Sequence, residues 1–120
     1  MYFKGNIHQT IFENAVNRLP QAPSDRMAAA LYLLTADHSV WRSVQNSIDN
    51  NHIFFEKIKL TNVSAGGYVL YKTARELYLK EPQITVSVLA DRSLISDRIW
   101  RLIQTAISIR RIGIQNAAEG

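Results

Sequence analysis

The segment 27–34 constrains the fold of this chain more than any other feature, because it contains no charged side chain. It reads Met-Ala-Ala-Ala-Leu-Tyr-Leu-Leu. On a helix these residues leave no continuous polar stripe, and in a soluble chain such a helix is surrounded by other helices. Ser24 precedes it as a predicted N-cap, and Asp25 suits the positive end of the helix dipole. The sequence therefore predicts a central helix over about 24–35.

Helical periodicity predicts further helices on both sides of this one. They cover 7–19, about ten residues after 36–38, a long stretch after Ser64, the short stretch 86–90, and a final stretch from Ser96 to Gly113. In the first of these, the predicted inner face consists of Ile7, Ile11, Phe12, Ala15, Val16 and Leu19. Trp41 and Val44 are the predicted core anchors of the third.

Residues 53–60 are the ambiguous part of the chain, since short apolar runs suit either a strand or one side of a helix. A strand needs a partner, and no second convincing strand is evident, so we favour a short helix or an irregular packed segment. The fold prediction is all-α: a compact single domain over 1–120, with five to six helices around the central one. The last residues, 117–120, are expected to fray.

Composition narrows the chemistry. The 120 residues include no cysteine, which excludes disulfides, thiolate zinc sites and cysteine nucleophiles, and fits a cytoplasmic location. No signal peptide is recognisable, and no apolar run approaches the ~20 residues of a membrane-spanning helix. The net charge of +4 favours an acidic protein or a nucleic acid as partner only mildly.

No constellation of residues nominates an enzyme. The three histidines match no zinc motif, Asp37 before His38 suits helix capping, and Gly66-Gly67 lacks the context of a phosphate loop. These glycines are expected to permit close helix approach. We therefore predict no cofactor, no metal and no catalysis; a pocket that joined His8 to an acid would revive an enzymatic interpretation.

Two residues are candidates for a buried polar site. His8 lies on the apolar side of the first helix, where it is either a base or ligand, or a packed histidine bonded to a backbone carbonyl or an acid. The packed histidine is favoured, because the sequence identifies no catalytic partner. Arg110 points along the apolar side of the last helix, where it binds an acid or extends its head to water.

Basic and aromatic residues on two helices are the candidate partner-binding surface. Tyr68, Lys72 and Arg75 share an exposed side of one helix, and Arg98, Arg101 and Arg111 share the polar side of the last. Arginine forks bind phosphates and carboxylates alike. The alternative is an ordinary solvated surface. A helix-turn-helix over the second and third helices is disfavoured, because its reading helix offers the single cation Arg42.

The chain also resembles small helical proteins of unknown function from Gram-positive bacteria and their phages or mobile elements. The resemblance rests on Tyr2-Phe3, His8, Phe12, the segment 31–35, the segment 74–78 and the isoleucine-rich last helix. It implies a helical fold and a mobile-element origin, without a reaction.

Two hypotheses follow for the function. The leading one is a non-enzymatic interaction protein that binds and inhibits a host defence complex, in the manner of an anti-CRISPR. The alternative is a nucleic-acid-binding regulator that uses a basic helical face. Either is compatible with a homodimer, and neither involves a membrane.

Overall fold

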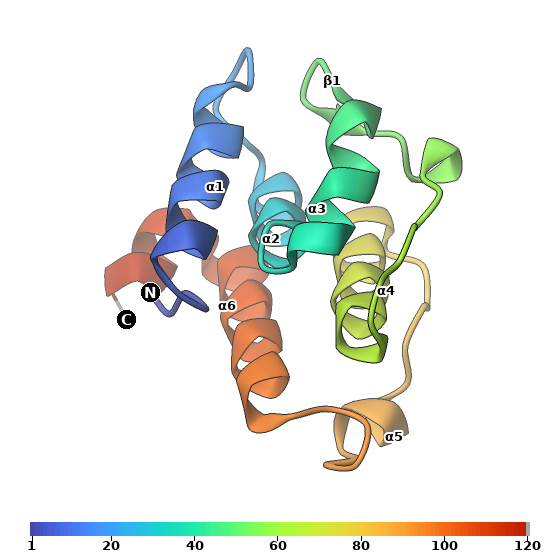
Figure 1. The fold of residues 1–120 in the computed structure, drawn as a ribbon. Coiled ribbons are helices and arrows are strands. Elements are labelled where there is room, and N and C mark those ends of the chain that lie inside the picture. The colour runs from blue at the N-terminus through green and yellow to red at the C-terminus, as the bar shows by residue number, and fades with distance from the viewer. Residues whose placement is uncertain (120) are drawn as a thin grey trace.

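A computed structural model describes residues 1–119 and shows a helical bundle (Figure 1). Its α-helices are α1 (Asn6–Asn17), α2 (Asp25–Leu34), α3 (His38–Val44), α4 (Ala65–Leu79), α5 (Val86–Leu89) and α6 (Asp97–Glu119). A small antiparallel hairpin, β1 (Ile48–Asp49) and β2 (His52–Ile53), lies between two 3₁₀ turns, η1 (Gln45–Ser47) and η2 (Phe55–Lys57). The predicted all-α class and the number of helices are confirmed.

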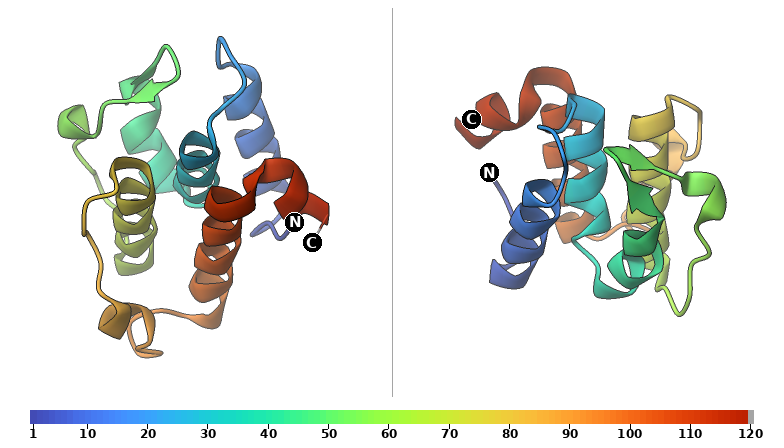
Figure 2. Two further views of the ribbon diagram at one scale, coloured as in Figure 1. Left: turned by 180° about the vertical axis from the view of Figure 1, so that it is seen from behind. Right: turned by 90° about the horizontal axis from the view of Figure 1, so that it is seen from above.

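Helix α2 is the centre of the bundle, as its sequence predicts. Every residue from 27 to 34 is at most 2% exposed, and α2 lies between α1 on one side and α4 on the other (Figures 1 and 2). The Ser24 hydroxyl accepts a hydrogen bond from the Met27 N–H at 3.2 Å and caps the first turn. Because α2 has no polar stripe, it is stable only where other helices exclude water from all of its sides.

The inner face of α1 differs from the prediction. His8, Phe12 and Ala15 are buried, whereas Ile7 is 77% exposed. The residues before the helix explain the difference, because Phe3 folds back and packs against the rings of His8, Phe12 and Tyr32. This aromatic cluster turns the His8 side of α1 toward α2 and leaves Ile7 in water.

The third helix is shorter than predicted, and a hairpin replaces its end. Helix α3 ends at Val44, and Ile48 pairs with Ile53. Asn50 and Asn51 both have positive φ, at 51° and 59°, which is the backbone of a tight two-residue hairpin turn. The strand partner that the sequence analysis did not find is therefore only two residues away across the turn. Trp41, predicted as a core anchor, is half-buried.

Helices α4 and α6 pack on α2 and are capped as predicted. Ser64 accepts a hydrogen bond from the Gly67 N–H at 3.0 Å, and Ser96 accepts one from the Ile99 N–H at 3.2 Å. Lys80, in the left-handed conformation, ends α4. The paired glycines do permit close packing: a Cβ on Gly66 would lie 3.3 Å from Ile99 Cδ1.

Gly113 interrupts α6 without ending it. Its φ of 85° and ψ of 162° are accessible essentially only to glycine, and helix resumes beyond it as far as Glu119. Of the residues expected to fray, Ala117 is helical and packs against the core, while Gly120 lies outside the described residues. The interruption turns the last part of α6 back toward the N-terminal segment (Figure 2).

Candidate functional site

An apolar groove opens where α5 meets the start of α6. Val86 is 80% exposed and Trp100 is 39% exposed, and both line this groove, which has a volume of about 560 Å³. We call its apolar members the corner patch: Val86, Leu89, Ala90, Ile95 and Trp100. Leu94, 55% exposed, precedes Ile95 in the chain. Large apolar side chains gathered around one exposed groove are typical of interaction sites.

The local sequence explains why Val86 stays exposed. Helix α5 has a single turn, capped by the Thr85 hydroxyl, which accepts a hydrogen bond from the Val88 N–H at 3.2 Å. One turn of helix cannot direct Val86, Val88 and Leu89 to the same side, because successive residues are 100° apart. Val88 and Leu89 pack partly against the core, and Val86 is left in water.

Side-chain hydrogen bonds hold both connections of α5 in place. Before it, the Glu76 carboxylate accepts bonds from the N–H groups of Gln83 and Ile84, at 2.7 and 3.0 Å. After it, Asp91 accepts bonds from the Ser93 N–H at 2.9 Å and the Ser93 hydroxyl at 2.6 Å. These bonds hold the pKa of Asp91 below its usual value. The groove is therefore shaped before any partner arrives.

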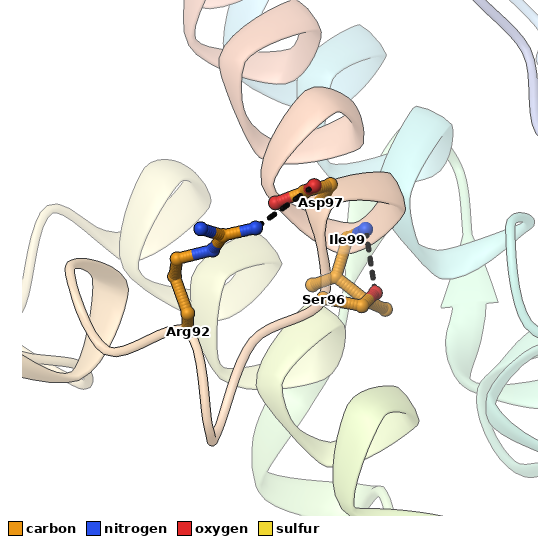
Figure 3. A network of polar contacts seen from close by, with 4 residues as sticks. All are labelled: Arg92, Ser96, Asp97 and Ile99. Carbon is orange, nitrogen blue, oxygen red and sulfur yellow. Dashed lines mark hydrogen bonds and ion pairs between the residues drawn. The ribbon is translucent and has the colours of Figure 1, made fainter.

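The rim of the corner patch is polar. Arg92 lies 3.6 Å from the Asp97 carboxylate, next to the cap that Ser96 forms on α6 (Figure 3). Both side chains are more than 80% exposed, so the pair contributes little to stability. An apolar centre with a polar rim is the usual anatomy of a protein interface.

The residues predicted on α4 fall into two groups. Tyr68 is 49% exposed, and the Lys72 Nζ lies 5.4 Å from the centre of its ring. Arg75 is half-buried: its Cζ lies 6.0 Å from the centre of the Phe55 ring, and its Nη1 donates a long bond of 3.5 Å to the Tyr71 hydroxyl. Arg75 therefore belongs to the packing around η2 rather than to a free cationic surface.

The arginines predicted on α6 are all exposed, but they do not join the α4 group. Arg101 stacks on the ring of Tyr2, with its Cζ 4.2 Å from the ring centre. Arg98 lies one turn before it, and Arg111 lies just before Gly113. Among the side chains of residues 1–118 none of the three forms an ion pair. The cations of α4 and α6 thus have different neighbours, and we treat them as separate surfaces.

His8 is the packed histidine that the sequence favours. Its Nδ1 accepts a hydrogen bond from the Lys4 N–H at 2.9 Å, and its Nε2 lies 2.8 Å from the Tyr32 carbonyl oxygen. Burial lowers the pKa of the His8 ring. Arg110 is half-buried on α6 and is not a hydrogen-bond partner of His8.

Among the described side chains, residues 1–118, no group of three or more His, Asp or Glu residues could hold a metal ion. No helix in the described part of the chain has the length and apolar character needed to cross a bilayer.

Sequence reasoning missed the corner patch, although two signals point to it. Trp100 is directed away from the buried side of α6, which consists of Leu102, Ile103, Ala106 and Ile109. Val86 belongs to a one-turn apolar segment that is too short to bury all of its side chains. No protein-family model, curated protein or solved structure matches this chain.

Proposed function

We propose that this chain is a non-enzymatic protein-interaction module that docks a larger protein at the corner patch. The observation that carries the proposal is the exposure of Val86 and Trp100 around one apolar groove. Tryptophan is enriched among the residues that dominate binding energy, particularly where apolar neighbours exclude water from it. Val86 and Trp100 supply such a centre, and Arg92 and Asp97 supply a rim.

The hydrogen bonds on both sides of the corner patch support the proposed docking role. Ordering a loop on binding costs free energy that reduces affinity. Here Glu76 and Asp91 already hold the connections on both sides of α5 through hydrogen bonds to the backbone. A partner therefore meets a groove whose flanking connections are already hydrogen-bonded, which lowers the ordering cost of binding.

The partner class follows from the resemblance noted above rather than from the groove. Small helical proteins of phages and mobile elements suit the role of an accessory factor that binds and inhibits a host defence complex. We therefore propose this class of partner. The nucleic-acid-binding alternative relies on Arg98 and Arg101 instead, and it predicts duplex DNA binding that falls steeply with salt.

The experiment compares two substitutions that each replace an exposed apolar residue by aspartate, one inside the corner patch and one outside it. Val86→Asp places a charge in the corner patch, whereas Ile7→Asp places one at an apolar residue that is 77% exposed on α1. In affinity purification from a host extract, we expect the unchanged chain and the Ile7→Asp variant to retain a stoichiometric protein partner. The Val86→Asp variant should lose it, because an unpaired charge would be desolvated in the interface.

Two results would count against the proposal. One is that the unchanged chain recovers no stoichiometric protein. The other is that both variants lose the partner equally. Light scattering of the purified chain adds a further test: a dimer that dissociates in the Val86→Asp variant alone would assign the corner patch to a second copy of this chain.

A further inference from the structure

A second, polar hollow lies on another part of the molecule, between the N-terminal segment and α6. Its volume is about 710 Å³, and its lining includes Tyr2, Arg101, Gln104, Ser108 and Ala117. Ala117 reaches it because Gly113 turns the end of α6 back toward residues 1–3 (Figure 2). An interruption at Gly113 thus adds a wall that a straight α6 would not provide.

The lining of the hollow is rich in hydrogen-bond donors. Arg101, Gln104 and Ser108 follow one another at helical spacing and line the same hollow. They offer a guanidinium, an amide and a hydroxyl. Among the side chains that the structure describes, residues 1–118, no aspartate or glutamate lines the hollow, and Arg101 forms no ion pair. The charge of the described lining is therefore positive.

Arg101 is held in position by an aromatic ring. Its Cζ lies 4.2 Å from the centre of the Tyr2 ring, a stacking that leaves the N–H groups at its edge free to donate. The Tyr2 backbone is held in turn, because the Tyr32 hydroxyl donates a hydrogen bond to the Tyr2 carbonyl. Tyr2 thus connects Arg101 to the buried helix α2: its ring contacts the guanidinium, and its carbonyl accepts the bond from Tyr32.

A ligand for this hollow must bring acceptors and negative charge. Arginine binds planar or tetrahedral oxyanions through two N–H groups at once. The hollow extends from Arg101 along α6 to Gln104 and Ser108 and across to residues 1–3, so an isolated anion at Arg101 would occupy only part of it. We propose that this hollow binds the phosphate group of a nucleotide-sized molecule, with Arg101 as the phosphate-binding residue.

This site is independent of the corner patch, since the two share no lining residue. A negative result in the protein-docking experiment would therefore not count against the phosphate site.

The test uses two neighbouring arginines of α6. Arg101→Gln removes the cation of the hollow, and Arg98→Gln removes an exposed cation one turn away that does not line it. Glutamine is a good helix former, so both variants should keep α6 intact, and circular dichroism would check this. Nucleoside monophosphates, the free nucleosides and inorganic phosphate are titrated into the labelled protein, with the amide signals of residues 101–108 observed by NMR.

The expected result is saturable binding of at least one nucleoside monophosphate, with shifts at Gln104 and Ser108. Its affinity should fall about tenfold or more in the Arg101→Gln variant, because a charged hydrogen bond is lost. The Arg98→Gln variant should bind like the unchanged chain, and the free nucleoside should bind far more weakly.

A titration with an oligonucleotide distinguishes a free nucleotide from a nucleic acid end as the source of the phosphate. If a 5′-phosphorylated single strand binds more tightly than the mononucleotide, and Arg101→Gln abolishes the gain, the phosphate comes from a nucleic acid end. The proposal is overturned if no monophosphate or phosphorylated strand shifts these signals at millimolar concentration. It is also overturned if Arg98→Gln weakens binding as much as Arg101→Gln.

Discussion

At the scale of single residues, His8 fastens the N-terminal segment to the central helix. Since its Nδ1 accepts the Lys4 N–H, its proton must be on Nε2, which donates to the Tyr32 carbonyl. The histidine is therefore neutral in the folded chain. Tyr32 adds a second tie through its hydroxyl, which donates to the Tyr2 carbonyl and whose pKa is raised by burial. Protonation of His8 would place a proton on Nδ1, which could then no longer accept the hydrogen bond from the Lys4 N–H.

This arrangement predicts that the stability of the chain depends on pH through His8. The folded-state pKa of His8 is below the ordinary value of 6.5, so the unfolded chain binds the proton more readily. Stability is then fully present above pH 6.5 and falls as the pH drops from 6.5 toward the folded-state pKa. The slope is at most about 1.4 kcal/mol per pH unit for one proton. Urea unfolding at several pH values between 7.5 and 5 measures it.

A His8→Gln variant serves as the control, because glutamine does not titrate. Its free energy of unfolding should be lower than that of the unchanged chain at pH 7.5, and the difference should shrink as the pH falls to 5. A difference that is constant over this range would show that His8 does not carry the pH dependence. The low pKa of Asp91 acts at more acidic pH and does not interfere.

At the scale of elements, two adjacent glycines determine how α4 docks on its neighbours. A Cβ on Gly67 would lie 2.9 Å from Val63 Cγ1 and 3.0 Å from Asp37 Oδ2. Neither atom can move easily, since valine is stiff at χ1 and Asp37 caps α3 by accepting a bond from the Val40 N–H at 3.0 Å. A Cβ on Gly66 would instead meet the flexible end of Ile99.

We therefore expect opposite effects from two single-methyl substitutions. Gly66→Ala should be neutral or stabilising by up to about 1 kcal/mol, because alanine favours the helix. Gly67→Ala should destabilise by about 1–3 kcal/mol, because the added methyl overpacks the junction of α3 and α4. Chemical denaturation of both variants measures this. Equal effects would mean that helix propensity outweighs packing at this junction.

The sequence predicts the elements whose signals are local. Helix α2 follows from its apolar run and Ser24, and the starts of α4 and α6 follow from Ser64 and Ser96. The hairpin escaped prediction because two-residue strands have no period to detect, and only the Asn50-Asn51 turn indicates them. The exposure of Ile7 escaped too, because it depends on Phe3 folding back onto α1, which is a contact outside the helix itself.

At the scale of the whole molecule, the burial of α2 makes the two halves of the chain interdependent. Helices α1 and α3 precede and follow it, and α4 and α6 pack against it. The radius of gyration of 13.1 Å agrees with the about 13.6 Å expected for one compact domain of this length. Removing either half would expose an apolar helix to water, so neither half is stable without the other.

One cooperative unfolding transition should result, and the two tryptophans report on it separately. Trp41 lies on α3 and Trp100 on α6. In the single-tryptophan variants Trp41→Phe and Trp100→Phe, fluorescence should report the same transition that circular dichroism reports for each variant. Fluorescence and circular dichroism midpoints that differ within one variant would show that α3 and α6 belong to separate units.

The candidate site was less predictable than the fold, for a physical reason. A charged residue indicates an exposed position in any sequence, so the sequence predicts Arg98, Arg101 and Arg111 at the surface. All three are exposed. An exposed apolar residue resembles a core residue until its neighbours are known. Val86 and Trp100 could be recognised only once the single turn of α5 and the buried side of α6 were known.

The position of α5 also affects how this protein can change over evolutionary time. The helix stands at the edge of the bundle, attached by two connections and distant from α2 (Figure 1). Substitutions of exposed residues there remove few core contacts, and such changes usually alter stability by less than about 0.5 kcal/mol. Natural selection can therefore vary the chemistry of Val86 and its surroundings with little loss of folded protein. The exposed chemistry around α5 is thus the part of the molecule that can be replaced repeatedly while the helical scaffold stays the same.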